Sequence, residues 1–130
     1  MNEQDVSSLK SDVFYQAGIF LGENGLLAPF GSVIKKGIIK PVGYYNDENE
    51  IVDTVKAVDV MREIFSKDIK FNKAEAAAIA YDVAMMIPDG NGNSVKRDAM
   101  CLLLSTDGEE WKQEYFPYTL IDDRCVWDSL

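Results

Sequence analysis

The chain has 130 residues, 47% of them hydrophobic, and its 22 acidic residues outnumber 13 basic ones, for a formal net charge of −9. This length and apolar content suit one globular domain and argue against disorder. The negative charge disfavours nucleic acids and anionic membranes as partners, and the absence of histidine removes the commonest proton shuttle and metal ligand.

Residues 4–21 are predicted to form an amphipathic helix. Its apolar side chains recur at helical spacing on one stripe, which comprises Val6, Leu9, Val13, Phe14, Ala17, Phe20 and Leu21. Gly22 and Gly25 then end the helix. The polar start of the chain differs from a secretory leader, and no apolar run reaches the roughly 18 residues of a transmembrane helix. We therefore expect a cytoplasmic protein.

Two short strands, residues 30–35 and 38–45, are expected to form a hairpin. The dipeptide Lys36-Gly37 between them suits a tight turn. Pro41 lacks a backbone N–H donor, so the second strand should lie at an edge of the sheet or carry a bulge.

A second helix is predicted from about residue 47 to residue 66. Asp47 and Glu50 have the spacing of a capping box at its start. Lys67 and Lys70 lie near its end, where the helix dipole favours cations. Its apolar stripe comprises Ile51, Val55, Val58, Met61 and Phe65.

The rest of the chain is predicted to be β-structure. Residues 76–87 alternate with the period of a strand, although their alanine-rich start would also suit a helix. Residues 88–93 are a loop rich in Gly and Asn. Residues 98–105 are apolar on both faces, which predicts a central strand. The last clear strand spans residues 111–118 and is stopped or bulged at Pro117.

The element order α-β-β-α-β-β-β predicts an α+β fold. Its simplest architecture packs both helices against one face of an antiparallel sheet of about five strands. The order is similar to that of profilin-like and roadblock-like proteins, an analogy of fold that carries no function. We expect one domain over residues 1–130, with residues 119–130 as an acidic C-terminal extension.

The two cysteines and the 89–93 loop are the segments that redox or metal chemistry would use. Cys101 lies in an apolar run and Cys125 in a polar tail, without Cys-x-x-Cys spacing. Free thiols in a reducing compartment are expected, and a bridge between them is the alternative. The loop begins like a calcium loop, but Ser94 and Met100 replace the required Gly and Glu. It is therefore interpreted as a hairpin loop, and no metal or cofactor is expected.

Asp82 is the carboxylate most suited to a catalytic or ligand-binding role. It lies mid-strand between Ala80 and Ala84, where burial would raise its pKa. Asp98 could lie beside it on a neighbouring strand and form an acid–base pair. The alternative is that Asp82 only accepts a structural hydrogen bond or faces water.

The strand at 111–118 carries the residues most suited to binding a protein. Alternate aromatic residues must point to opposite faces, which leaves some of them on the outside of the sheet. Exposed aromatic side chains rimmed by acids would make a protein-binding face. The predicted contact residues are Trp111, Tyr115, Glu109, Glu110, Glu114, Asp122 and Asp123. An ordinary amphipathic edge strand is the alternative.

Four short motifs occur in a moderately specific order. They are Ala-Pro-Phe-Gly at 28–31, an alanine-rich run ending in Tyr-Asp-Val at 76–83, Asp-Ala at 98–99 and Phe-Pro-Tyr at 116–118. In these motifs the chain resembles a family of small bacterial proteins of uncharacterised function, over roughly residues 13–118. The resemblance implies a bacterial, cytoplasmic, single-domain protein and brings no activity with it.

Small size, strong acidity and the lack of a catalytic motif favour a non-enzymatic protein-binding domain. The most specific hypothesis is an immunity-type inhibitor of a basic bacterial toxin, steered electrostatically onto a cationic active site. One alternative is an enzyme or small-ligand protein that uses Asp82 and Asp98. The other is a homodimeric scaffold in which an edge strand or helix pairs with its copy.

Overall fold

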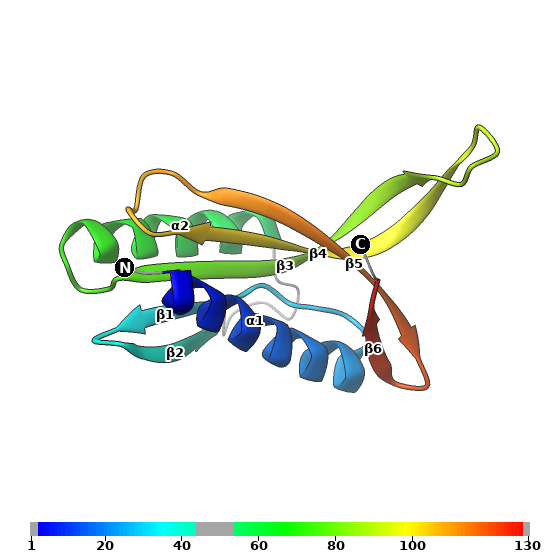
Figure 1. The fold of residues 1–130 in the computed structure, drawn as a ribbon. Coiled ribbons are helices and arrows are strands. Elements are labelled where there is room, and N and C mark those ends of the chain that lie inside the picture. Colours follow the sequence, from blue (N-terminus) through cyan, green and yellow to red (C-terminus); the bar gives the residue numbers. More distant parts are fainter. Residues whose placement is uncertain (1–2, 44–53, 129–130) are drawn as a thin grey trace.

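The structure, a computed structural model, describes residues 3–43 and 54–128 and has an α+β fold (Figure 1). The described elements are α1 (Glu3–Asn24), β1 (Phe30–Lys35), β2 (Ile38–Gly43), α2 (Thr54–Lys70), β3 (Ala76–Pro88), β4 (Ser94–Ser105), β5 (Lys112–Ile121) and β6 (Arg124–Trp127). The predicted class and element order are confirmed, and one further strand follows at the end.

The described strands form a single antiparallel sheet in the order β2-β1-β3-β4-β5-β6. β2 lies at one edge, as the missing donor of Pro41 predicts. Lys36 and Gly37 take left-handed backbone conformations, with φ of 53° and 76°, and form the tight turn between β1 and β2.

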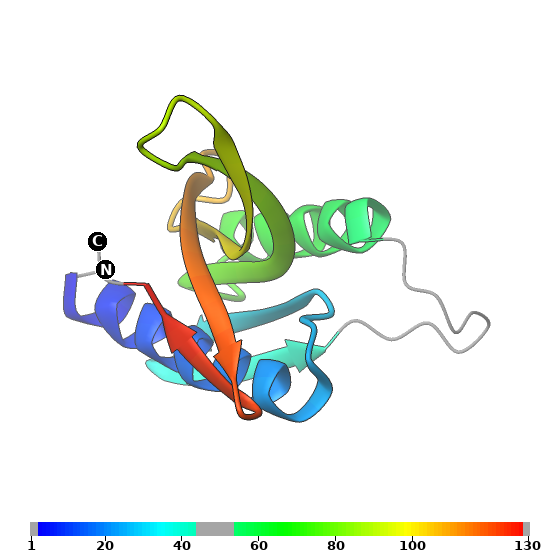
Figure 2. The ribbon, with the colours of Figure 1, turned by 90° about the vertical axis from the view of Figure 1, so that its right-hand side faces the viewer.

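The two helices lie on opposite faces of the sheet, so the predicted packing of both on one face is wrong (Figure 2). α1 packs against Ala78 and Leu102, whereas α2 packs against the adjacent residues Ile79 and Leu103. Successive strand residues point to opposite faces, so β3 and β4 present an apolar surface on each side. One helix is needed on each face to remove both surfaces from water.

The alanines of β3 let both helices approach the sheet closely. Ala76 to Ala80 form a strand although alanine favours helices, because β1 and β4 flank this segment and both of its faces are buried. On β1, Gly31 has a similar role, since a Cβ there would lie 2.6 Å from the Phe65 ring of α2.

α2 follows its predicted stripe only in part. Val58, Met61 and Phe65 are buried as predicted, while Val55 is exposed. The helix continues to Lys70, and Asn72 follows it with a φ of 61°, which suits the left-handed cap after a helix. The predicted capping box at Asp47 and Glu50 lies outside the described residues.

The sheet curls around α1. The core cluster that contains the buried stripe of this helix includes side chains from all six described strands. Phe14 makes edge-to-face contacts with Phe116 and Trp127, with ring centroids 4.7 Å and 4.8 Å apart. These contacts hold β6 against the helix.

Most of the predicted C-terminal extension belongs to the sheet. β5 runs through Pro117 to Ile121, and β6 pairs with its second half, from Tyr118 opposite Trp127 to Ile121 opposite Arg124. Pro117 is the last residue of β5 that pairs with β4, which accords with its missing N–H. The proline therefore does not end the strand but marks the change of neighbour from β4 to β6.

β3 and β4 extend beyond the rest of the sheet as a two-stranded ribbon, which we call the arm (residues 81–98). β1 pairs with β3 only as far as Ala80, and β5 pairs with β4 only from Ala99 onward. β3 and β4 continue to pair with each other as far as Pro88 opposite Ser94. The arm projects away from both helices (Figures 1 and 2).

Candidate functional site

The predicted protein-binding residues lie in separate parts of the molecule. Glu109, Glu110 and Trp111 belong to the β4–β5 connection or border it, Glu114 and Tyr115 lie on β5, and Asp122 and Asp123 form the β5–β6 turn. Of this set, Glu110 and Glu114 line one cavity. The structure does not gather the seven residues into one surface.

Trp111 is partly buried and holds the β4–β5 connection against α2. Its ring packs against the core cluster on the α2 face, and its Nε1 donates a hydrogen bond to Ser66 Oγ at 3.1 Å. Gly108 reinforces the contact, because a Cβ there would lie 2.6 Å from the Ser66 carbonyl oxygen. The indole therefore stabilises the fold at this end of the sheet.

Glu114 and Tyr115 point to opposite faces of β5, as neighbouring strand residues must. Glu114 forms an ion pair with Lys10 of α1, in which Lys10 Nζ lies 2.6 Å from Glu114 Oε1. Tyr115 is 42% exposed on the α2 face, where its hydroxyl accepts a hydrogen bond from Gln113 Nε2 at 2.7 Å. On the same face, burial and a hydrogen bond to Cys101 raise the pKa of Tyr81 to about 12.

Asp122 and Asp123 form the exposed tip of the β5–β6 hairpin, where both take positive φ values, 48° and 61°. A Cβ at Gly22 would lie 2.8 Å from the Asp123 carbonyl oxygen. The tip therefore docks closely on the last turns of α1, at the opposite end of β5 from the β4–β5 connection.

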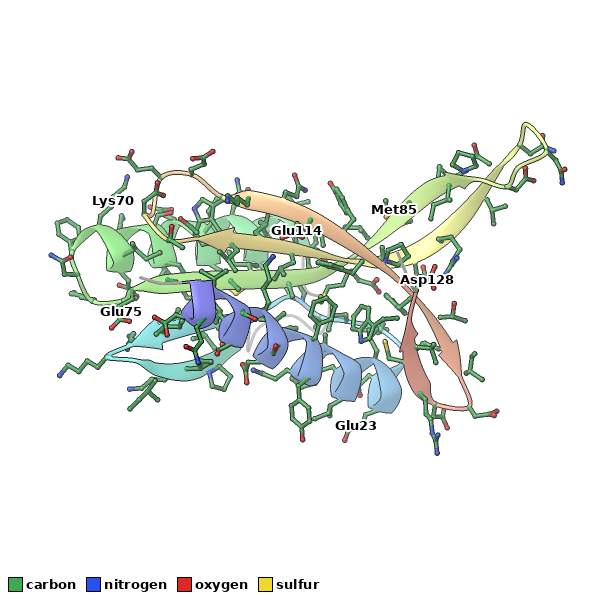
Figure 3. The ribbon with its side chains drawn as sticks, viewed as in Figure 1. Glu23, Lys70, Glu75, Met85, Glu114 and Asp128 are labelled. Atoms are coloured by element: carbon green, nitrogen blue, oxygen red, sulfur yellow. The ribbon has the colours of Figure 1, made fainter. Side chains whose placement is uncertain are left out.

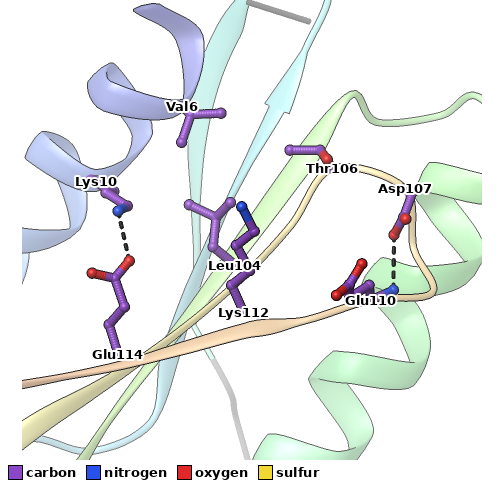
Figure 4. Close-up of a pocket in the computed structure, with 8 residues that line it drawn as sticks. All are labelled: Val6, Lys10, Leu104, Thr106, Asp107, Glu110, Lys112 and Glu114. Carbon is purple, nitrogen blue, oxygen red and sulfur yellow. Dashed lines mark hydrogen bonds and ion pairs between the residues drawn. The ribbon is translucent and has the colours of Figure 1, made fainter. Parts of the chain in front are cut away.

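A cavity of about 150 Å³ opens between the start of α1 and the start of β5 (Figure 4). Its lining is Val6, Lys10, Leu104, Thr106, Asp107, Glu110, Lys112 and Glu114. The Asp107 carboxylate accepts the backbone N–H groups of Glu110 and Glu109 at 2.9 Å and 2.8 Å, which lowers its pKa. Because lysines and acids face each other here, the cavity has no dominant charge.

Asp82 lies in a hydrogen-bonded network on the α1 face. Tyr118 donates its hydroxyl to Asp82 Oδ1 at 2.8 Å, and the backbone N–H of Leu27 also reaches this carboxylate. Burial, opposed by these hydrogen bonds and assisted by the charge of Asp98, raises the pKa of Asp82. Burial and the carboxylate together raise the pKa of Tyr118.

Asp98 lies near Asp82 but on the exposed root of the arm. Asp82 pairs with Met100 and Asp98 with Ala84, so the two carboxylates lie diagonally across β3 and β4 on one face. The Asp82 carboxylate already accepts hydrogen bonds from Tyr118 and Leu27, which matches the structural interpretation of this residue better than the catalytic one. The network ties the loop before β1 and the second half of β5 to the root of the arm.

Cys101 and Cys125 are both free in the structure. Cys101 is buried in the core on the α2 face, whereas Cys125 packs against the cluster on the α1 face. Burial raises the pKa of the Cys125 thiol. The sheet therefore separates the two sulfur atoms.

The 89–93 loop is the tip of the arm. The Asp89 carboxylate accepts the backbone N–H groups of Asn91 and Asn93 at 2.7 Å and 3.3 Å. This is the pattern of an Asx turn, as expected for a hairpin loop. Within residues 3–43 and 54–128, no three His, Cys, Asp or Glu side chains gather into a group that could hold a metal.

The arm is the functional candidate that the sequence interpretation missed. Its outer β3 edge runs from Tyr81 to Pro88. After Asp82, whose carboxylate accepts the Tyr118 hydroxyl, this edge has the sequence Val-Ala-Met-Met-Ile-Pro without a charged residue. Its outer β4 edge, residues 94–98, carries Lys96, Arg97 and Asp98. In the part of the chain that the structure describes, neither edge pairs with a further strand. A signal was available in the length of the predicted strand 76–87, which is twice that of the strand 30–35, its neighbour in the structure.

Other described edges of the sheet carry the usual protection against strand pairing. β2 has Lys40 and Pro41, and the short β6 begins with Arg124. Met86 of the arm is 66% exposed, and Val95 on the facing strand is 47% exposed. Figure 3 shows Met85 on the arm, away from the helices.

Comparisons with known proteins add no relative. No protein-family model matches the chain, and no curated protein or solved structure gives a significant match. The resemblance to a bacterial family therefore stays a prediction. In the described residues, neither helix has the length and apolarity required to cross a membrane.

Proposed function

We propose that this chain is a non-enzymatic protein-binding domain that binds an extended segment of its partner along the outer edge of β3 in the arm. In this mode the partner adds a strand to the sheet, and main-chain hydrogen bonds supply the affinity. The interaction requires an open strand edge, and the segment from Val83 to Ile87 provides one.

The observation that carries this proposal is the difference between the two edges of the arm. Proteins protect exposed edges with charges, prolines or bulges, because an open edge pairs with any extended chain. The β4 edge has three charged residues in five, Lys96, Arg97 and Asp98, whereas residues 83–87 of the β3 edge have none. An open apolar edge on a projecting ribbon is a liability unless a partner covers it.

The net charge of −9 favours a basic partner. An anionic surface speeds the encounter with a cationic protein, and the apolar edge then supplies the short-range contact. The most specific form of the proposal is an immunity-type inhibitor that docks on a basic toxin domain in the bacterial cytoplasm. The exposed acids at the hairpin tip and in the β4–β5 connection, Asp122, Asp123, Glu109 and Glu110, would contribute to steering.

Site-specific photo-cross-linking in the cells that carry the gene tests the proposal. A photoreactive amino acid at position 86 should give one adduct with a basic protein, and the same amino acid at position 95 on the β4 edge should not. Adding Ala84→Lys, which places a charge on the exposed edge, should remove the adduct. Equal adducts at positions 86 and 95, or none at position 86, would contradict the proposal.

An adduct of two copies of this chain would overturn the inhibitor and support the homodimeric scaffold. The β3 edge is compatible with that outcome, because antiparallel pairing of residues 83–87 with themselves places Met85 opposite its own copy and Ala84 opposite Met86, and brings no like charges together. The mass of the adduct separates the two cases directly.

A further inference from the structure

We infer that a lysine-lined cleft at the opposite end of the molecule from the arm binds a small multivalent phosphate. The cleft has a volume of about 460 Å³ and lies between the β1–β2 hairpin and the α2–β3 connection. Its charged lining residues are Lys35, Lys36, Lys40, Lys73 and Glu75. In Figure 3 the labelled residues Lys70 and Glu75 mark this end of the molecule.

The strand register aims the hairpin lysines into one space. Lys35 pairs with Ile38, and Lys40 pairs with Val33, whose side chain belongs to the core on the α2 face. Paired residues and residues two apart on a strand share a face, so Lys35, Ile38 and Lys40 all lie on the α2 side. On this part of the face the α2–β3 connection, not α2 itself, forms the other wall of the cleft, and Ile38, which is 60% exposed, lines the cleft with the lysines.

Backbone hydrogen bonds fix the two walls relative to each other. The Glu75 N–H donates to the Ile34 carbonyl at 2.8 Å, and the Gly37 N–H donates to Glu75 Oε1 at 3.3 Å. The reversal after α2 places Lys73 on the second wall, because its N–H donates to the Asp68 carbonyl at 2.7 Å. A binding site built on such tied segments loses little conformational entropy when it is occupied.

The charge of the cleft is opposite to that of the protein. Four lysines face one glutamate, a formal charge of 4 − 1 = +3, in a chain whose total is −9. Within the described residues, none of these four lysines forms an ion pair, whereas the nearby Lys67 and Lys70 pair with Glu63 and Glu109. Like charges held close together repel each other, and a multivalent anion removes this repulsion.

The lining indicates which anions would bind. A lysine ammonium group is a point charge that binds phosphate without the fixed fork of arginine. Affinity should therefore rise with the charge of the ligand, from phosphate to pyrophosphate to tripolyphosphate. The exposed Ile38 side chain offers an apolar contact to a ligand that carries an organic group, as a nucleoside triphosphate does.

Isothermal titration calorimetry with sodium tripolyphosphate at low salt tests this inference. The wild-type protein should bind, and the double substitution Lys36→Gln, Lys73→Gln should weaken binding about tenfold or more, since it removes half of the lysine charge. Lys96→Gln on the arm is a control for the loss of an exposed lysine outside the cleft. The affinity of the Lys96→Gln variant should stay within about twofold of wild type. Added salt should weaken tripolyphosphate binding by the wild type and by this control.

Equal binding by the double variant, or no binding by the wild type, would overturn the inference. ATP that binds tighter than tripolyphosphate assigns the site to a nucleotide, and equal affinity assigns it to free polyphosphate. If a short polyglutamate peptide binds more tightly than tripolyphosphate, the ligand of the cleft is an acidic protein segment, and the assignment of a phosphate ligand is wrong. Circular dichroism melting of each variant shows whether the fold is intact.

Discussion

The same two strands, β3 and β4, behave as a buried core at one end and as an exposed ribbon at the other. Residues 76–80 and 99–104 are buried on both faces between the helices, whereas most side chains of the arm are half-buried or exposed. The pairing between the strands continues without a break across this boundary. The change therefore lies in what covers the strands and not in the ladder itself.

The buried halves of β3 and β4 supply stability, whereas the arm is the proposed site of binding. A two-stranded ribbon is marginally stable alone, so the arm is held by its root and contributes little to the folding free energy. Apolar residues such as Met85 and Met86 nevertheless continue into the arm, beyond the point at which the helices cover the sheet. Substitutions in the root and in the arm should therefore affect different measurements.

The largest effect on stability is expected at the root. Ile79→Ala removes a fully buried side chain from the α2 face and should lower the free energy of unfolding by about 3 kcal/mol. Met86→Ala in the arm should lower it by less than about 0.5 kcal/mol, because Met86 is mostly exposed. Urea unfolding followed by circular dichroism measures both. A similar loss in the two variants would contradict the division between root and arm.

A second prediction tests how closely α2 packs on the sheet. Gly31→Ala places a Cβ 2.6 Å from the Phe65 ring and should lower the free energy of unfolding by about 2 kcal/mol, as overpacking does. Gly18→Ala is the matched control in α1, where a Cβ meets no atom within 4 Å. This substitution should stabilise the protein by roughly 0.5–1 kcal/mol through helix propensity. Stabilisation by Gly31→Ala would show that β1 and α2 are not in close contact.

A third prediction concerns pH and the network at the root of the arm. Because burial raises the folded-state pKa of Asp82 above 3.8, the folded protein holds this proton more tightly, and the contribution of Asp82 to stability falls as pH rises above that value. Asp82→Asn removes this dependence. The stability of the variant relative to wild type should therefore increase between about pH 3 and pH 7.

Asp107 provides the control of opposite sign. Backbone N–H groups of Glu110 and Glu109 lower its pKa, so its contribution to stability is present at neutral pH and is lost as pH falls. The stability of Asp107→Asn relative to wild type should therefore decrease between about pH 3 and pH 7. Unfolding midpoints across pH measure both variants, and parallel curves would contradict the assignments.

The sequence predicts the elements of this fold better than their arrangement. The stripe of α1, the edge position of β2 from Pro41 and the central position of β4 all follow from local patterns. The placement of the helices does not, because the small residues from Ala76 to Ala80 give little sign that both faces of β3 are buried. Which face is covered depends on the neighbouring strands, and no local pattern contains that information.

The predicted binding residues illustrate the same limit. Composition groups Trp111, Glu114 and Tyr115 because they are close in sequence, yet strand alternation alone requires Glu114 and Tyr115 to face opposite ways. Contacts with distant elements decide the rest, since Ser66 of α2 binds Trp111 and Lys10 of α1 binds Glu114. The arm was predictable from strand length, whereas its open β3 edge also required the register of β1.

The smallest expected effect on stability belongs to the arm and gives the most direct test of the proposed function. Met86→Lys places a charge on an exposed side chain of the β3 edge and should change the free energy of unfolding by less than about 0.5 kcal/mol. The charge should nevertheless prevent strand addition, as lysines do on natural edges. Cross-linking from a photoreactive amino acid at position 84 should be lost in this variant and kept in Val95→Lys, which makes the same change on the β4 edge. If Val95→Lys abolishes cross-linking equally, the partner contacts both edges of the arm. The difference in charge between the two edges then does not determine where the partner binds.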